Sequence, residues 1–406
     1  MSYNYTYFTV LSNNHDSKHV DGMPEPHLQF REDREAPIIT NCSDYDVAIT
    51  NFKLDTKCLP SFIPTIKFNN DSPTDIQRNE TIYQITLGIR ADGTDNTPYV
   101  SHTESVMFVP QDTTTNNESD IPPPFQDGYA NYKSGYYDLF NYENFFTMVN
   151  KAISDCMEGL KAFWDSFYEP GWFLKKYGNS NGDIDIPYFI FDKGTGLIFL
   201  NSPQTVAGLT IFLNFPLYRL FDSLPFQRKY TKFVNSDGRT GRTTTYTLYE
   251  LKLTNFGNSN AIDLIPQTTG QNKATVKVPH YVIYQDYETL TSWSPVESIV
   301  ISSGNLPIKS SVVSQNHSFI NGIETVEGSS NIVEMEMSEF RSGQPKPGII
   351  YEPNILRWVN MLDQNELRSI HLQVFYRLKM NGQLIPFKLN SGGSFGMKLC
   401  FRKLKN

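Results

Sequence analysis

A cluster of glutamates is the grouping in this sequence most able to do chemistry. Glu334, Glu336 and Glu339 lie close together, and a pair of carboxylates can perform the acid and base steps of glycoside hydrolysis. The same segment also fits a strand with one wet face, because the apolar residues Val333 and Met335 alternate with the first two glutamates. We favour the strand, and we predict no catalytic residue here.

Two other polar segments resemble metal sites. His15 and His19 are four residues apart with Asp16 beside them, but no helical pattern there would hold both imidazoles on one face. Residues 178–185 (GNSNGDID) are as rich in oxygen as a calcium loop, but they lack the spacing and the bidentate glutamate of an EF-hand. We expect a surface turn at 178–185, and we predict no metal site and no cofactor.

Cysteine spacing and motif searches point away from an enzyme. The sequence holds no P-loop, no GxGxxG and no HExxH. Its cysteines are far apart and form no CxxC pair, which argues against both a disulfide framework and a zinc site. They are expected to be small buried apolar residues: Cys42, Cys58, Cys156 and Cys400.

Composition favours β structure and extensive protein contacts. Among 406 residues there are 28 Phe and 23 Tyr, whereas charged residues make up only 19%, and aromatic side chains suit both strands and interfaces. The net charge of −8 gives no global reason for nucleic-acid binding. No apolar stretch is long enough to span a membrane and no signal peptide is visible, so we expect synthesis in a cytosolic or nuclear compartment.

The C-terminal forty residues alternate apolar and polar side chains in three runs. The apolar positions are Ile370, Leu372, Val374, Tyr376 and Leu378, then Ile385, Phe387 and Leu389, then Phe395, Met397, Leu399 and Phe401. This period of two predicts half-buried strands, which we expect to form an antiparallel meander. Phe375 breaks the pattern as an apolar residue on the polar face. We therefore expect a strand, loop or subunit to cover it.

One helix and about sixteen short strands are predicted. Apolar residues from Phe145 to Trp164 recur every three or four positions, which predicts a helix over 142–164. The strands favour an all-β fold of two jelly-roll β-sandwiches in tandem, with a single jelly-roll carrying large insertions as the alternative. The expected domains are a flexible arm (1–35), a first sandwich (36–255), a linker (256–278) and a second sandwich (279–406).

Several segments resemble one family of viral proteins. They are residues 292–308, which begin Ser-Trp-Ser-Pro, residues 340–358, which contain Ile-Ile-Tyr-Glu-Pro, and the endings at 381–386 and 397–401. Together they resemble jelly-roll capsid proteins of small eukaryotic DNA viruses, the virophage, Polinton and adintovirus group. The resemblance covers about residues 290–406 and implies a structural subunit of an icosahedral shell. It implies either a double jelly-roll that forms trimers or a single one that forms pentamers at vertices.

The partners implied are copies of the chain itself and other capsid proteins, within a virion. Trp293, Trp358 and Phe375 are the candidate interface residues. A carbohydrate-binding β-sandwich remains an alternative, since Trp293 and Trp358 could stack on sugars beside carboxylates. A viral attachment protein is another, in which the loop at 110–135 would carry the binding surface.

Overall fold

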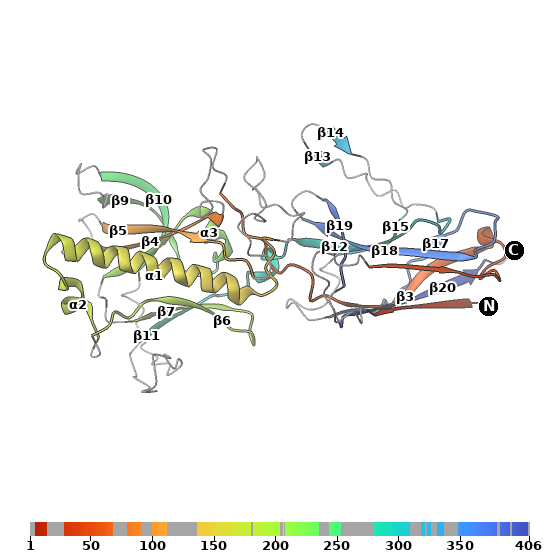
Figure 1. Cartoon of the computed structure of the whole chain (residues 1–406), viewed down its shortest axis with the longest axis horizontal. Helices are drawn as coiled ribbons and strands as arrows, with labels where there is room; N and C mark the ends of the chain where they lie inside the picture. Colours follow the sequence, from red (N-terminus) through yellow and green to blue (C-terminus); the bar gives the residue numbers. More distant parts are fainter. Residues whose placement is uncertain are drawn as a thin grey trace, which may run out of the picture. The chain divides into compact units, whose positions relative to one another are not determined.

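The chain folds into two compact units (Figure 1). A computed structural model describes residues 5–13, 28–67, 79–90, 99–111, 136–179, 182–203, 206, 208–234, 243–252, 280–308, 318–320, 323–325, 331–336, 348–379, 382–389 and 392–404. Unit 1 combines residues 1–61 with residues 294–406, and unit 2 consists of residues 62–293. Each unit is described by itself below.

Two antiparallel sheets make up unit 1. In the first sheet the strand order is β1 (Tyr5–Asn13), β20 (Ser394–Lys403), β3 (Tyr45–Asp55) and β16 (Gly348–Tyr351), and β17 (Val359–Asn360) also pairs with β3. In the second it is β15 (Asn331–Glu336), β12 (Val296–Ser303), β18 (Ser369–Leu378) and β19 (Leu384–Pro386), and β2 (Gln29–Asp33) also pairs with β18. The short elements η1 (Cys42–Asp44), β13 (Ser318–Ile320) and β14 (Ile323–Thr325) complete the described secondary structure outside unit 2.

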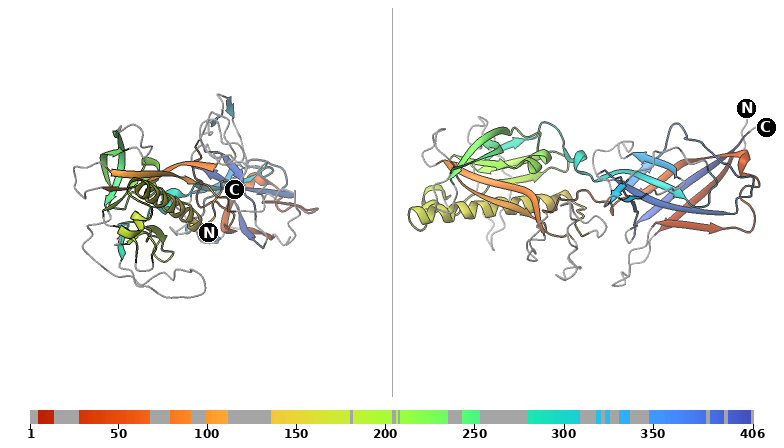
Figure 2. Two further views of the ribbon diagram at one scale, coloured as in Figure 1. Left: turned by 60° about the vertical axis from the view of Figure 1, so that its left-hand side comes forward. Right: turned by 90° about the horizontal axis from the view of Figure 1, so that it is seen from above.

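The order of the strands identifies the fold of unit 1. Along the chain, β1, β3, β16 and β20 belong to the first sheet, while β2, β12, β15 and β18 belong to the second. Both ends of the chain therefore enter the same sandwich, and strands from the two ends run beside each other (Figure 2). Eight strands that cross between two sheets in this order form a jelly-roll. The predicted all-β jelly-roll fold is confirmed.

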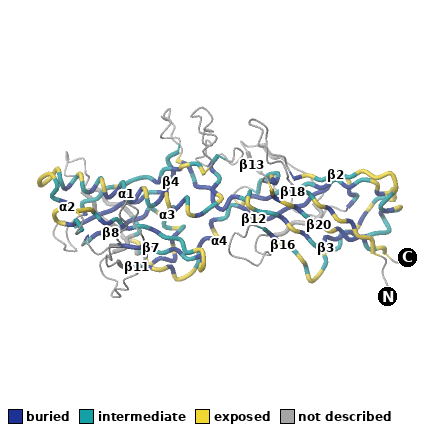
Figure 3. Tube along the Cα trace, turned by 60° about the horizontal axis from the view of Figure 1, so that its bottom comes forward, coloured by how far each residue is buried: buried dark blue, intermediate teal, exposed yellow. Residues whose placement is uncertain are grey.

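Alternation of side chains builds the core of this sandwich (Figure 3). In β18, Ile370, Leu372 and Val374 are all buried, as their period of two predicts. The two sheets meet where Phe8 of β1 packs edge-on against Phe30 of β2, with ring centres 6.2 Å apart. Burying these side chains is the main favourable contribution to the stability of the unit.

Two predictions about unit 1 were wrong. Residues 1–35 are not simply a flexible arm, because β1 and β2 within them are strands of the jelly-roll. The three C-terminal runs do not form a meander either. The first two pair with each other as β18 and β19, but the third, β20, lies in the other sheet between β1 and β3. Alternation predicts that a segment is a strand, but it does not say which strand lies beside it.

Unit 2 combines a small barrel, a second sheet and helices. The closed barrel has the order β10 (Thr243–Lys252), β8 (Leu209–Leu213), β4 (Glu80–Arg90), β5 (Tyr99–Met107) and β9 (Gln227–Val234). The three-stranded sheet has the order β11 (His280–Tyr284), β7 (Ile198–Pro203) and β6 (Tyr188–Phe191). The helices are α1 (Tyr142–Phe167), α2 (Trp172–Tyr177), α3 (Phe215–Leu220) and α4 (Leu290–Trp293).

The predicted helix is confirmed as α1, which lies between the barrel and the three-stranded sheet (Figure 1). The side chain of Asn141 caps its start by accepting a hydrogen bond from the Glu143 amide at 2.9 Å. Asn150 then joins the helix to β6, since its side chain both accepts from the Phe189 amide (2.7 Å) and donates to the Phe189 carbonyl (2.9 Å). None of the helices in the described part of the chain is long and apolar enough to cross a membrane.

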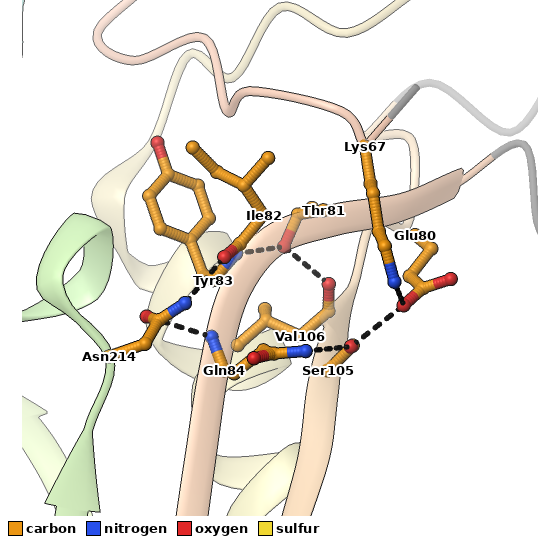
Figure 4. Close-up of polar contacts among 9 residues, drawn as sticks. All are labelled: Lys67, Glu80, Thr81, Ile82, Tyr83, Gln84, Ser105, Val106 and Asn214. Carbon is orange, nitrogen blue, oxygen red and sulfur yellow. Dashed lines mark hydrogen bonds and ion pairs between the residues drawn. The ribbon is translucent and has the colours of Figure 1, made fainter. Parts of the chain in front are cut away.

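Asn214 joins the start of α3 to the barrel (Figure 4). Its side chain donates to the Ile82 carbonyl at 2.7 Å and accepts from the Gln84 amide at 3.1 Å. The same oxygen also accepts from the Leu217 amide at 3.3 Å, as an N-cap residue does. Nearby, Glu80 accepts from Ser105 (2.9 Å) and pairs with Lys67 (2.8 Å), which ties β4 to β5 and to the chain before it.

The boundaries between the two units differ from the predicted domain boundaries. Instead of two sandwiches in succession, a single jelly-roll is interrupted after β3 by unit 2 and resumes at β12. This is the predicted alternative of one jelly-roll with a large insertion. The division was misjudged because pairing between the two ends of a chain leaves no local sign in the sequence. The predicted linker at 256–278 lies outside the described residues.

Candidate assembly surface

The outer face of the first sheet, meaning the face turned away from the jelly-roll core, carries aromatic side chains. Phe8 and Val10 of β1 are buried, so Tyr5, Tyr7 and Leu11 point the other way. Tyr5 is 46% exposed and Tyr7 is 55% exposed. Exposed apolar patches mark interaction sites. Two large exposed rings side by side on a sheet whose other face is well packed therefore indicate a surface that binds a partner.

An ion pair joins the two central strands of this sheet. Arg402 of β20 lies opposite Asp46 of β3, and its Nη2 donates to Asp46 Oδ2 at 2.6 Å. The Asp46 side chain is only 4% exposed, whereas that of Arg402 is 25% exposed. The guanidinium carbon of Arg402 also lies 4.2 Å from the ring centre of Trp358, which directly precedes β17. Arginine can make both contacts at once because its cation is planar.

Further rings extend this arrangement toward the sheet edge. The rings of Tyr5 and Trp358 are inclined by 28° with centres 6.4 Å apart, and Tyr5 and Tyr7 are arranged almost identically. The ammonium of Lys398 lies 4.6 Å from the ring centre of Tyr7. We call Tyr5, Tyr7 and Trp358, with the flanking cations Arg402 and Lys398, the aromatic layer. Two strands, β1 and β20, and the residue before a third, β17, contribute to it, so it exists only in the folded sheet.

The charge of the aromatic layer comes from its two cations. Burial raises the pKa of the Cys400 thiol, and the nearby Cys400 in turn raises the pKa of Tyr7. The thiol and the phenol therefore stay protonated and uncharged at neutral pH. A surface with exposed rings and two cations suits a partner that offers apolar side chains and carboxylates.

Apolar side chains continue on both sides of the aromatic layer. Leu11 of β1 lies opposite Gly396 and is 71% exposed, and Ile350 of β16 lies opposite Lys53 and is 64% exposed. Each edge strand of the sheet thus carries an exposed aliphatic side chain on this face. We regard the outer face of this sheet as the candidate assembly surface.

Comparison with known proteins places the chain among viral capsid proteins. The family model described as Sputnik minor capsid protein V18/19 matches residues 6–403. The chain belongs to this family. Its role is therefore that of a structural capsid component of the virion, which assembles with other capsid proteins.

Solved structures agree with this assignment. A chain in the 3.5 Å cryo-electron microscopy structure of the Sputnik virophage matches with a TM-score of 0.69 at 20% identity, over 98% of both chains. The crystal structure of the mavirus penton protein matches with a TM-score of 0.58 at 16% identity, over 99% of this chain and 100% of the other. No curated protein matches the chain. At these identities the likeness concerns the fold, and it extends over the whole length, inserted unit included.

The three predicted interface residues of this minor capsid protein lie in different surroundings. Trp293 is 4% exposed, packs against Phe62 and Phe145 in the core of unit 2, and donates through Nε1 to the Leu220 carbonyl at 3.2 Å. Trp293 is therefore a core residue of unit 2. Trp358 is half-buried in the aromatic layer.

Phe375 is half-buried on β18, with Val300 of β12 and Pro386 of β19 opposite it on the two neighbouring strands. These residues lie beside Phe375 within the sheet, and the expected cover of its outer face by a strand, loop or subunit stays a prediction. Its role in an interface stays a prediction, as does that of Trp358.

The other polar groupings take ordinary structural roles where they are described. Residues 178–185 include a turn in which Asn179 accepts from the Asp183 amide (3.0 Å) and donates to Asp185 (2.9 Å). Glu334 and Glu336 belong to strand β15, as alternation predicted, whereas His15, His19 and Glu339 lie outside the described residues. The described residues contain no group of three or more possible metal ligands.

Residues 392–396 (GGSFG) match the G-x-S-x-G pattern of hydrolases. Their serine, Ser394, begins β20, which continues as a strand to Lys403. A nucleophile elbow needs a helix after the serine, so this match has no catalytic meaning here.

Sequence reasoning did not find the aromatic layer. Residues 5–11 consist of tyrosine, threonine, phenylalanine, valine and leucine, and aromatic and β-branched residues of this kind favour strands. That signal could have identified β1. The polar and charged residues that follow, around 15–35, led us to treat the whole segment as an arm.

Proposed function

We propose that this minor capsid protein is the vertex subunit of its shell and forms a ring of five copies. One observation carries the proposal: the chain has a single jelly-roll, interrupted by unit 2, rather than two in tandem. In the virus group that the sequence resembles, the single jelly-roll is the form expected to make pentamers at vertices. The likeness to the mavirus penton protein over the full length supports the same choice.

The aromatic layer is the surface proposed to bind the neighbouring copy. Trp, Tyr and Arg are the residues that most often dominate binding energy at interfaces, and the layer consists of Trp358, Tyr5, Tyr7 and Arg402 with one lysine. Arg402 is already held by Asp46. Little side-chain entropy would therefore be lost on binding, which favours association.

The carbohydrate-binding alternative finds less support. Trp293 is buried, and the ring of Trp358 already contacts both Arg402 and Tyr5. A sugar-stacking site needs an open ring face with carboxylates beside it, whereas Trp293 is buried and the charged group next to the Trp358 ring is the Arg402 guanidinium. The role that we propose is structural and involves no catalysed reaction.

The mass and symmetry of the purified full chain test this function. We expect native mass spectrometry to give five copies and electron micrographs of single particles to show five-fold rings. Stable trimers, or monomers at every concentration tested, would contradict the proposal.

A matched pair of variants tests the surface. Trp358→Ala should weaken association by about thirtyfold, the loss expected for an interface hot spot. Phe167→Ala removes a ring that is 68% exposed in unit 2 and should leave association unchanged. Equal effects of the two variants would contradict a role for the aromatic layer.

A further inference from the structure

The edges of the two jelly-roll sheets differ in charge. β1, an edge strand of the first sheet, has the sequence YTYFTVLSN, with no charged residue and no proline in its nine residues. Natural proteins normally protect edge strands with charges, prolines or bulges, because an unprotected edge pairs with strands of other molecules. Within the described residues, β20 is the only strand that pairs with β1.

The second sheet of the same jelly-roll provides the contrast. Its edge strand β2 has the sequence QFRED, so three of its five residues are charged. Arg31 pairs with Asp33 at 3.1 Å, and Arg34 just beyond the strand pairs with Glu32 at 2.5 Å. One edge is thus protected against pairing while the other, in the same sandwich, is not. Charged residues thus protect the β2 edge of the second sheet but not the β1 edge of the first.

The opposite edge of the first sheet resembles β1. Its strand β16 has the sequence GIIY, again without charge or proline, and its outward side chain Ile350 is 64% exposed. Leu11 of β1 is likewise exposed on the same face, at 71%. The first sheet therefore presents an uncharged edge with an exposed aliphatic residue on each side.

We propose that the outer edge of β1 pairs with the β16 edge of a neighbouring copy, so that the first sheet continues from one subunit into the next. Contact between two different edges is heterologous, and a heterologous contact closes into a ring when the rotation between copies fits. Pairing β1 with β1 would instead stop at a dimer. This inference rests on the proposed ring of copies and names the strands that join them. Main-chain hydrogen bonds supply the attraction, and the aromatic layer lies on the face beside the junction.

Chemical cross-linking distinguishes the two kinds of contact. In a full-length Cys58→Ser background, the double variant Leu11→Cys/Ile350→Cys treated with a short bismaleimide should give a ladder of cross-linked multimers. A mixture of the two single variants should give dimers and nothing larger, and each single variant alone should stay monomeric. Dimers from Leu11→Cys alone would show β1–β1 pairing and overturn the inference. The same reagent on the Cys58→Ser protein measures the background from the buried cysteines Cys42, Cys156 and Cys400.

Proline substitution tests whether main-chain hydrogen bonds make the contact. Thr6 and Thr9 are exposed residues of opposite parity on β1, so one amide points toward β20 and the other toward the outer edge. Of Thr6→Pro and Thr9→Pro, one should lower the melting temperature, and the other should leave it nearly unchanged while weakening association at least about tenfold. Thr6→Ala and Thr9→Ala are the matched controls.

Failure of this inference differs from failure of the proposed function. If the unmodified chain forms rings that neither proline variant weakens, the edge pairing is wrong while the vertex role stands. If the unmodified chain forms no ring, the vertex role itself is wrong and the edge pairing falls with it.

Discussion

Arg402 and Asp46, which are 356 positions apart in the sequence, form an ion pair 2.6 Å long across neighbouring strands of the jelly-roll. The pair joins the two ends of the chain, because Asp46 lies before the inserted unit and Arg402 near the C-terminus. The guanidinium also supports the ring of Trp358. Stability of the sheet and the shape of the aromatic layer therefore depend on the same residue.

Arg402→Ala should lower the free energy of unfolding by about 3 kcal/mol, because it leaves the Asp46 carboxylate buried without its cation. Arg402→Lys should recover part of this loss, since an ammonium can pair with the carboxylate but cannot present a planar face to Trp358. Urea unfolding of the full chain measures both. Lys398→Ala, which removes the exposed cation beside Tyr7, should change the free energy by less than about 0.5 kcal/mol. An equal loss in Lys398→Ala would contradict the special role of the buried pair.

Asn214→Ala should lower the free energy of unfolding by about 2 kcal/mol. The substitution removes the cap of α3, worth about 1 kcal/mol, together with the hydrogen bonds to Ile82 and Gln84 of β4. Asn214→Asp keeps an oxygen for the Gln84 and Leu217 amides but cannot donate to the Ile82 carbonyl. It should fall between the wild type and the alanine variant in thermal unfolding. A larger loss for aspartate than for alanine would show that repulsion from the Ile82 carbonyl outweighs the cap.

The sequence predicted individual strands better than it predicted their neighbours. Ile370 to Leu378 and Phe395 to Phe401 were assigned to strands correctly because alternation is a local property, measurable within ten residues. Pairing is not local: β20 pairs with β1, near the other end of the chain, through contacts such as Leu399 opposite Phe8. The expected meander and the expected tandem domains both failed for this reason.

The candidate surface was only partly predictable for a related reason. Trp293 and Trp358 look alike in the sequence, since each lies just before a segment with the pattern of a strand. The structure buries one among Phe62, Tyr142 and Phe145 and leaves the other beside Arg402 on the outer face. Only tertiary packing separates a core tryptophan from a surface one.

Gly159→Ala should destabilise the chain, although alanine favours helices over glycine by about 1 kcal/mol. A Cβ on Gly159 of α1 would overlap the imidazole of His102 on β5, and overpacking of this kind costs about 1–3 kcal/mol. His102→Ala in the same protein should remove the clash. The double-mutant cycle, measured by thermal unfolding, should therefore give a favourable coupling between the two substitutions. Additive effects would show that the helix and β5 do not meet at this point.

Stability should fall as the pH rises from about 9 to 12, because two buried groups of α1 hold their protons in the folded chain. Burial raises the pKa of the Cys156 thiol from 9.0 to about 12, and burial followed by the charge of Glu288 raises that of Tyr142 from 10.0 to about 12. In this window the unfolded chain loses these protons and the folded chain keeps them. Their contribution to stability is therefore complete below pH 9 and decreases above it.

The double variant Cys156→Ser/Tyr142→Phe isolates this contribution. Neither replacement titrates in the window, so each removes up to about 1.4 kcal/mol per pH unit from the slope of unfolding free energy against pH. Urea titrations at pH 8, 9, 10 and 11 measure the slope, which should be shallower in the double variant than in the wild type. The comparison uses slopes rather than absolute stabilities, so a constant packing cost of the substitutions does not affect it. Identical slopes would show that neither group retains its proton in the folded chain.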